Sequence, residues 1–165
     1  MSKLEELIKA KGDERLAQEN AKEEAYERET EEILEKIKEY YPRVRKAIMV
    51  MDTIKRDDPI LWDKINPRNY DTLYAYKQDN YFFTDSWAHQ LGFFGNRLTA
   101  IGNSAGGACG NVNFSVTYNN CTFSTEKGSW SRECAKRFPK NFEAFENRFR
   151  NFVNSQYGDG AYDLF

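Results

Sequence analysis

The sequence has few of the residues on which metal and redox sites depend. It contains one histidine, His89, and three cysteines, Cys109, Cys121 and Cys134, with no Cys-x-x-Cys pair. A structural zinc site needs four such ligands at closer spacing, so none is expected. An odd number of cysteines without paired spacing is typical of reduced thiols in a reducing compartment. We therefore predict no bound metal and no other cofactor.

Long apolar runs are also missing. No stretch approaches the roughly eighteen apolar residues that a membrane-spanning helix needs. The first residues, MSKLEELIKAKGDE, are too charged to form the apolar core of a secretory signal. We expect a cytoplasmic protein that makes no use of a membrane.

Acidic and aromatic residues are concentrated in different parts of the chain. Residues 1–32 carry 6 Lys and Arg against 11 Asp and Glu, a net charge of −5, whereas residues 61–125 contain no Glu at all. Of the 25 aromatic residues, only Tyr26, Tyr40 and Tyr41 precede residue 61. This division predicts a charged helical arm, residues 1–41, followed by an aromatic-rich globular domain, residues 42–165.

The clearest pattern runs from Ile33 to Ile54. Apolar residues recur there every three or four positions, as they do along one side of an amphipathic helix. Pro42 falls within the pattern without shifting its phase, so it either kinks one long helix or lies in the first turn of a second helix. The stripe consists of Ile33, Ile37, Tyr40, Val44, Ala47, Met51 and Ile54, with Leu34, Tyr41 and Ile48 beside it.

The arm before this stripe is rich in residues that favour helix. A short helical turn is predicted around Leu7, ending before Gly12, and a second, charged helix from Asp13 to Glu32. The apolar residues of the charged helix are mostly alanines, which bury little surface. We expect it to project into solvent or to lie along a partner.

The remainder of the chain predicts short elements around a small antiparallel sheet. Asp58 and Pro59 mark the start of a short helix, Ile60–Ile65, in which Trp62 anchors the core. Further on, alternating apolar and polar residues and the pair Asn119-Asn120 predict a hairpin. The predicted elements are strands at Leu73–Lys77, Tyr81–Thr84, Leu98–Ile101, Val112–Tyr118 and Cys121–Ser124, and a helical turn at Ser86–Leu91.

The last part of the chain predicts two helices. Ser131 is expected to cap a short helix that ends before Pro139, and a longer helix, Lys140–Gln156, carries one wide aromatic face. Gly158 is expected to end that helix, and the tail after it is expected to be loose unless Tyr162 or Phe165 docks. The predicted fold class is α+β, with two amphipathic helices on one face of the sheet.

A glycine-rich loop gives one alternative function, a small hydrolase at Gly102–Gly110. Its first five residues match the G-x-S-x-G pattern of a serine nucleophile, Ser104. That mechanism needs a helix after the serine and a base later in the chain. In this sequence, glycines and a predicted strand follow Ser104 in place of a helix, and the single histidine, His89, comes before the serine. The loop also lacks the Gly-Lys-Ser/Thr ending of a phosphate-binding loop.

A basic cluster gives a second alternative, nucleic-acid binding. The cluster consists of Arg132, Lys136, Arg137 and Lys140, and tyrosines between residues 70 and 81 could stack on bases. The sequence pI of about 5.6 and the acidic arm oppose contact with a phosphate backbone. Only a basic patch separated from the arm would bind.

The leading prediction is a non-enzymatic regulator or inhibitor that binds another protein through an acidic helical arm and an aromatic surface. An acidic arm can enter a basic, nucleic-acid-binding groove of an enzyme, and the apolar stripe could pair with a second copy in a homodimer. The small size, the back half rich in Asn, Tyr and Phe, and the lack of a catalytic motif resemble phage and mobile-element proteins. Those include inhibitors of bacterial defence enzymes such as anti-CRISPR proteins. The predicted partner-binding residues are Glu23, Glu24, Glu27, Glu31, Ile33, Ile37, Tyr40 and Tyr41.

Overall fold

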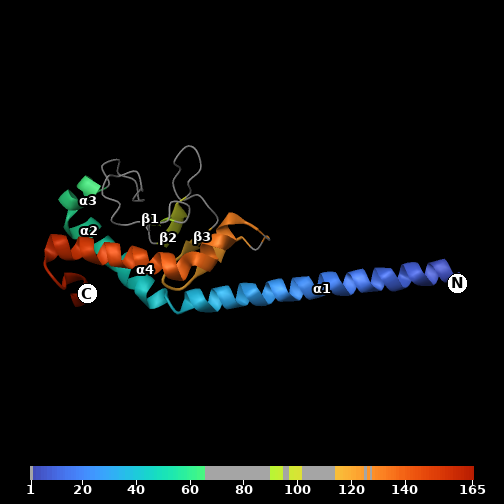
Figure 1. Cartoon of the computed structure of the whole chain (residues 1–165). Coiled ribbons are helices and arrows are strands. Elements are labelled where there is room, and N and C mark those ends of the chain that lie inside the picture. The colour runs from blue at the N-terminus through green and yellow to red at the C-terminus, as the bar shows by residue number, and fades with distance from the viewer. Residues whose placement is uncertain (1, 66–89, 95–96, 102–113, 125, 127) are drawn as a thin grey trace. The chain divides into compact units, whose positions relative to one another are not determined.

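The structure, a computed structural model, describes residues 2–65, 90–94, 97–101, 114–124, 126 and 128–165 (Figure 1). The chain forms two compact units, Met1–Glu35 and Lys36–Phe165. Throughout the described ranges, each helix is too short or too polar to cross a lipid bilayer.

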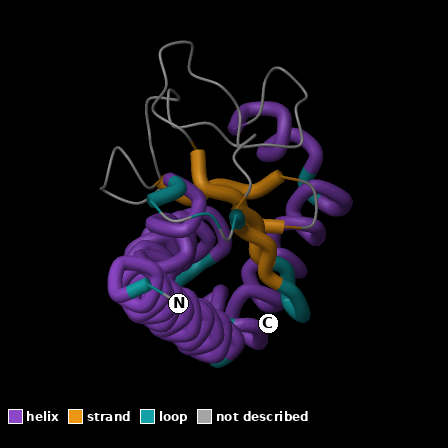
Figure 2. Tube along the Cα trace, turned by 90° about the vertical axis from the view of Figure 1, so that its right-hand side faces the viewer, coloured by secondary structure: helices purple, strands orange, loops and turns teal. Residues whose placement is uncertain are grey.

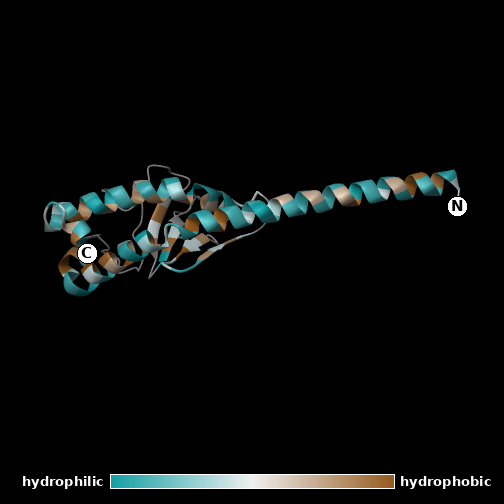
Figure 3. Ribbon diagram, turned by 90° about the horizontal axis from the view of Figure 1, so that it is seen from below, coloured by the Kyte–Doolittle hydropathy of each residue, from teal (hydrophilic) through white to brown (hydrophobic). Residues whose placement is uncertain are grey.

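The first helix, α1 (Lys3–Lys38), is one continuous helix. The prediction that Gly12 separates two helices is therefore wrong. A glycine costs a helix only about 1 kcal/mol relative to alanine, and an ion pair of 3.2 Å between Lys11 and Glu14 spans this position. The Ser2 hydroxyl accepts a hydrogen bond from the Glu5 amide and caps the first turn. Figure 3 shows α1 as mostly hydrophilic, with apolar residues toward both of its ends.

The predicted stripe crosses a break between two helices. α1 ends at Lys38 and α2 (Tyr41–Asp57) starts with Pro42 in its first turn. An amide in the first turn of a helix has no partner within the helix, so the missing N–H of proline costs nothing there. The structure therefore confirms the arrangement in which Pro42 lies in the first turn of a second helix, and not a single kinked helix. The stripe residues within α2 are buried from Val44 onward, and so is Val50, which the stripe did not include. The buried stripe residues are Val44, Ala47, Ile48, Met51 and Ile54.

The short helix α3 (Pro59–Ile65) forms as predicted. The Asp58 carboxylate accepts a hydrogen bond from the Leu61 amide at 3.3 Å, which caps the first turn. Trp62 is 5% exposed and belongs to the core. The Lys55 ammonium lies 5.4 Å from the centre of its ring.

Within the described ranges the sheet has four antiparallel strands in the order β1-β2-β3-β4. The prediction of a helical turn over Ser86–Leu91 is wrong for Gln90 and Leu91, which pair with Ile101 and Ala100. Pairing with a neighbouring strand decides the conformation there, because Leu91 and Phe93 then share a buried face. The predicted strands at residues 73–77 and 81–84, and residues 112–113, lie outside the described residues. The strand bounds are β1 Gln90–Phe94, β2 Arg97–Ile101, β3 Phe114–Val116 and β4 Cys121–Phe123.

The last long helix, α4 (Trp130–Tyr157), passes through Pro139 without ending. The prediction of two helices here is wrong, and so is the prediction that Ser131 caps the first of them. Ser129 caps the helix by accepting from the Arg132 amide, whereas Ser131 accepts from the Ser124 amide at 2.9 Å. An interior proline costs about 3 kcal/mol. Burial of the phenylalanines on either side of it, Phe138 and Phe142, both 0% exposed, offsets that cost.

α4 carries the core across one face of the sheet (Figures 1 and 2). Phe93 of β1 lies 5.2 Å from both Phe145 and Phe149, measured between ring centres, and Phe114 of β3 lies 5.9 Å from Phe138. The helices and the small antiparallel sheet confirm the α+β prediction.

The tail after α4 is folded against the helix. Gly158 ends α4 at a φ of 114°, as predicted. A 3-10 helix, η2 (Ala161–Leu164), follows and starts at Gly160, whose φ of 74° favours glycine. Tyr162 is 1% exposed, so the tail docks through this side chain.

Candidate functional site

A row of five glutamates runs along the first unit. Glu19, Glu23, Glu27, Glu31 and Glu35 follow one another at intervals of four residues, and all five are exposed. Side chains four apart on a helix are neighbours on its surface, so these residues form a continuous acidic ridge. We use this name for the five residues below.

The acidic ridge is poorly neutralised by its own helix. Glu19 forms an exposed ion pair with Lys22 at 3.5 Å. Within the described part of the chain, no ion pair is formed by Glu23, Glu27, Glu31 or Glu35. Glu24 is also exposed and lies beside the ridge. Glu23, Glu27 and Glu31 belong to the predicted partner-binding residues. Glu19 and Glu35 do not, although the four-residue spacing places them on the same line.

The apolar residues predicted to bind a partner are less accessible than the glutamates. Ile37 is 0% exposed and Ile33 is 8% exposed. Tyr40 and Tyr41 are half-buried, and the Tyr40 ring meets Phe138 and Phe142 edge-on at 5.9 and 5.7 Å. Ile37 and Tyr40 therefore contribute to the core of the second unit, and the acidic side chains remain the exposed members of the predicted site.

The predicted basic cluster does not form one exposed patch. Arg132 is 2% exposed and belongs to the interior, whereas Lys136, Arg137 and Lys140 are exposed. Lys136 pairs with Glu133 at 3.6 Å. Burial of Arg132 removes one of the four cations on which the nucleic-acid alternative relied.

The hydrolase alternative falls on residues that the structure does not describe, because His89 and all of Gly102–Gly110 lie outside the described ranges. The two described thiols are poor nucleophiles at neutral pH. Burial raises the pKa of Cys121 and the pKa of Cys134 to about 12 each. Among the described residues, no group of three or more His, Cys, Asp or Glu side chains could hold a metal ion.

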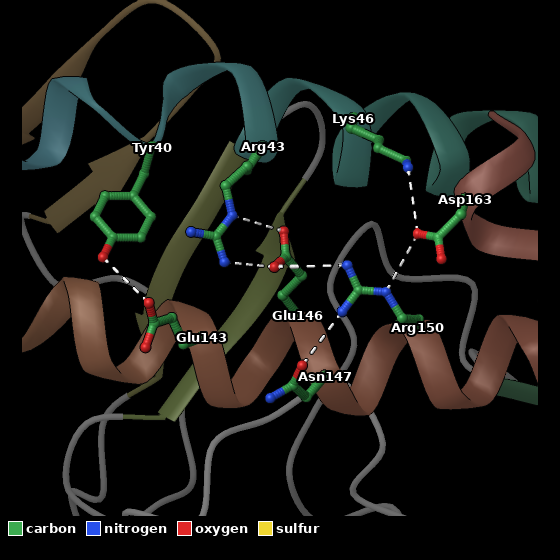
Figure 4. Close-up of polar contacts among 8 residues, drawn as sticks. All are labelled: Tyr40, Arg43, Lys46, Glu143, Glu146, Asn147, Arg150 and Asp163. Carbon is green, nitrogen blue, oxygen red and sulfur yellow. Dashed lines mark hydrogen bonds and ion pairs between the residues drawn. The ribbon is translucent and has the colours of Figure 1, made fainter. Parts of the chain in front are cut away.

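A network of ion pairs joins α2, α4 and η2 (Figure 4). The Glu146 side chain is 7% exposed and accepts two hydrogen bonds from Arg43, at 2.6 and 3.1 Å. These bonds raise the pKa of the Arg43 guanidinium. Asp163 lies 3.5 Å from Arg150 and 3.9 Å from Lys46. Each of these charges faces an opposite charge within the protein, so the network positions α2, α4 and η2 relative to one another.

Tyr162 lies at the centre of this arrangement. Lys46 and Arg150 lie 4.6 and 5.2 Å from the centre of its ring, and Phe149 packs against it edge-on. Its hydroxyl is buried and has no hydrogen-bond partner in the described structure. The ring therefore makes several stabilising contacts, whereas the buried hydroxyl forms no hydrogen bond that would offset its removal from water.

The Tyr162→Phe substitution is expected to increase the free energy of unfolding by about 1 kcal/mol, because it removes a buried, unpartnered hydroxyl and keeps the ring. Chemical denaturation at pH 8 measures the change. Tyr157→Phe is the matched control. It removes a hydroxyl that donates to Asp58 at 2.7 Å, so it should destabilise the protein. Loss of stability in Tyr162→Phe would contradict the expectation.

The gain from Tyr162→Phe should grow at high pH. Burial raises the pKa of Tyr162 above its ordinary value of 10.0. The unfolded chain loses this proton near pH 10 while the folded chain retains it, so folding stability falls as the pH rises above 10. The phenylalanine variant lacks this term. The difference in unfolding free energy between variant and wild type should therefore be larger at pH 11 than at pH 8.

No protein-family model, curated protein or solved structure matches this chain.

Proposed function

We propose that this protein is a non-enzymatic regulator that binds a basic surface of another protein through the acidic ridge of α1. The observation that carries the proposal is the exposure of five glutamates at intervals of four residues on a helix that buries little of its own surface. Opposite charge on a partner is the feature that such a surface recognises.

The spacing itself disfavours the free helix. Like charges four residues apart destabilise a helix by about 0.2–0.5 kcal/mol for each pair. α1 tolerates this cost because Ala, Glu, Lys and Arg, which favour helix, dominate its sequence. Lysines and arginines of a partner would remove the repulsion on binding. The partner thus stabilises the helix that recognises it.

The length of the acidic ridge favours an extended partner surface. Glu19 and Glu35 are sixteen residues apart, which corresponds to about 24 Å along a helix. A groove that binds nucleic acid offers basic side chains over such a distance. We therefore propose a nucleic-acid-binding enzyme as the partner, with a bacterial defence enzyme as the class to test first and the cytoplasm as the compartment.

Neutralising the acidic ridge is expected to weaken partner binding at least tenfold. The variant carries Glu23→Gln, Glu27→Gln, Glu31→Gln and Glu35→Gln. The control removes the same number of charges from the first half of the same helix: Glu5→Gln, Glu6→Gln, Asp13→Asn and Glu14→Gln. Proteins captured from a nuclease-treated bacterial lysate identify the partner, and titration calorimetry against it compares the three chains at low and moderate salt.

Only the wild type and the control should bind tightly, and their affinity should fall steeply with salt because the contact is ionic. Equal binding by the ridge variant and the control would contradict the proposal. A gel shift with DNA or RNA at low salt that persists in the ridge variant would favour the nucleic-acid alternative instead.

A further inference from the structure

The second unit contains a pocket that none of the predicted sites includes. Its volume is about 350 Å³, and its walls come from the end of α2, the end of α4 and the docked tail. Val50, Ile54 and Val153 line it and are 4–5% exposed. Tyr162, which the ion-pair network holds in place, forms part of the wall. Buried residues of α2 and α4 therefore form the floor of the pocket.

We propose that this pocket binds one bulky apolar side chain of a partner protein, with a lysine or arginine of the same segment beside it. The volume lies near the lower end of the range for ligand pockets, about 300–1,000 Å³, so it suits one large side chain better than a cofactor. The proposal rests on the proposed function, because it names what a basic partner places on the second unit.

Exposed aromatic side chains surround the pocket, which suits the binding of an apolar side chain. Tyr157 and Phe165 line the pocket, yet they are 46% and 52% exposed, and Leu164 next to Phe165 is 87% exposed. Exposed aromatic side chains around an apolar pocket are typical of the centre of a protein interface. Both rings are exposed to solvent in the free protein, and an apolar side chain in the pocket would bury part of them.

The aspartates in the pocket wall favour a partner segment that carries positive charge. Asp57 and Asp58 are the charged residues in its wall. Asp58 is committed to the fold, since it accepts from the Leu61 amide and the Tyr157 hydroxyl. Asp57 forms an ion pair with the exposed Arg56 at 2.8 Å, and this hydrogen bond lowers the pKa of Asp57. A cation from the partner can replace Arg56, because both side chains of that pair are more than half exposed.

Three acetylated and amidated pentapeptides distinguish the contribution of the apolar side chain from that of the flanking charge. They are Gly-Lys-Trp-Lys-Gly, Gly-Glu-Trp-Glu-Gly and Gly-Lys-Ala-Lys-Gly. Each is titrated into the ¹⁵N-labelled full-length chain, and amide chemical shifts locate the contact. The first peptide should shift the amides of Val50, Ile54, Val153 and Ala161. The second should bind there at least tenfold more weakly, and the third should leave these amides unchanged.

Two variants test the residues. Asp57→Lys should abolish the preference for the Lys-Trp-Lys peptide or reverse it, and it leaves the caps made by Asp58 intact. Ala161→Trp fills the pocket and should abolish binding of both tryptophan peptides; its spectrum shows whether the fold is kept. The proposal is overturned if the two tryptophan peptides bind wild type equally, or if Asp57→Lys leaves the preference unchanged.

This experiment also separates the two proposals. A basic peptide that contacts the acidic ridge shifts amides of residues 19–35 whether or not it contains tryptophan. Shifts at residues 19–35 without shifts around Ile54 would support the acidic ridge and overturn the pocket. Shifts around Ile54 that require tryptophan would support the pocket, whatever happens on α1.

Discussion

Replacing Phe142 by alanine is expected to lower the free energy of unfolding by about 3–5 kcal/mol. Phe142 is 0% exposed and lies within 5.5–6.1 Å of the ring centres of Phe138, Tyr40 and Phe145. Removal of its ring leaves a cavity on the α4 face where three aromatic neighbours meet. Urea denaturation followed by circular dichroism measures the loss.

The matched control is Tyr118→Ala. Tyr118 is 42% exposed, and the Arg45 guanidinium lies 5.4 Å from the centre of its ring. Its loss should cost about 1 kcal/mol or less. If Phe142→Ala does not fold, Phe142→Leu, with an expected cost of about 1 kcal/mol, keeps the comparison measurable. Equal costs for Phe142→Ala and Tyr118→Ala would show that the core does not lie where the structure places it.

Replacing Glu146 by alanine is expected to lower the free energy of unfolding by about 2–3 kcal/mol. The substitution removes two charge-assisted hydrogen bonds and leaves the Arg43 guanidinium without its carboxylate partner. The cost stays below that of breaking a fully buried pair, since the Arg43 side chain is 44% exposed and water can solvate it. The same denaturation experiment measures it, and Glu146→Gln tests whether the charge or the side-chain shape matters.

Glu143→Ala provides the comparison on the same helix, one turn earlier. Glu143 is exposed, and its contact with the Tyr40 hydroxyl is 3.5 Å long. A long, exposed contact of this kind contributes little, so the change should stay within about 0.5 kcal/mol. Similar effects for Glu143→Ala and Glu146→Ala would mean that the network in Figure 4 does not hold α2 to α4.

Much of the secondary structure could be predicted from the sequence, because it depends on neighbouring residues. The spacing of apolar residues identified α2, the pair Asp58-Pro59 identified the start of α3, and Gly158 marked the end of α4. β2 and the hairpin of β3 and β4 followed from alternation and turn residues. The acidic ridge is equally local, since spacing alone places its glutamates on one line of α1.

The sequence by itself therefore determined α2, the start of α3 and the acidic face of α1, because these depend on residues up to four positions apart. Alternation and turn residues identified β2, β3 and β4 among the described strands, and together with the helices they gave the α+β class. The tertiary structure alone decided whether Pro139 ends a helix, whether Gln90 and Leu91 join the sheet, and whether Tyr162 docks. Each outcome depends on partners outside the local segment. Phe138, next to Pro139, packs against Tyr40 and Phe114. Gln90 pairs with Ile101, and the Tyr162 ring lies beside Lys46. The pocket beside Asp57 has the same origin, because its walls come from three segments that only folding brings together.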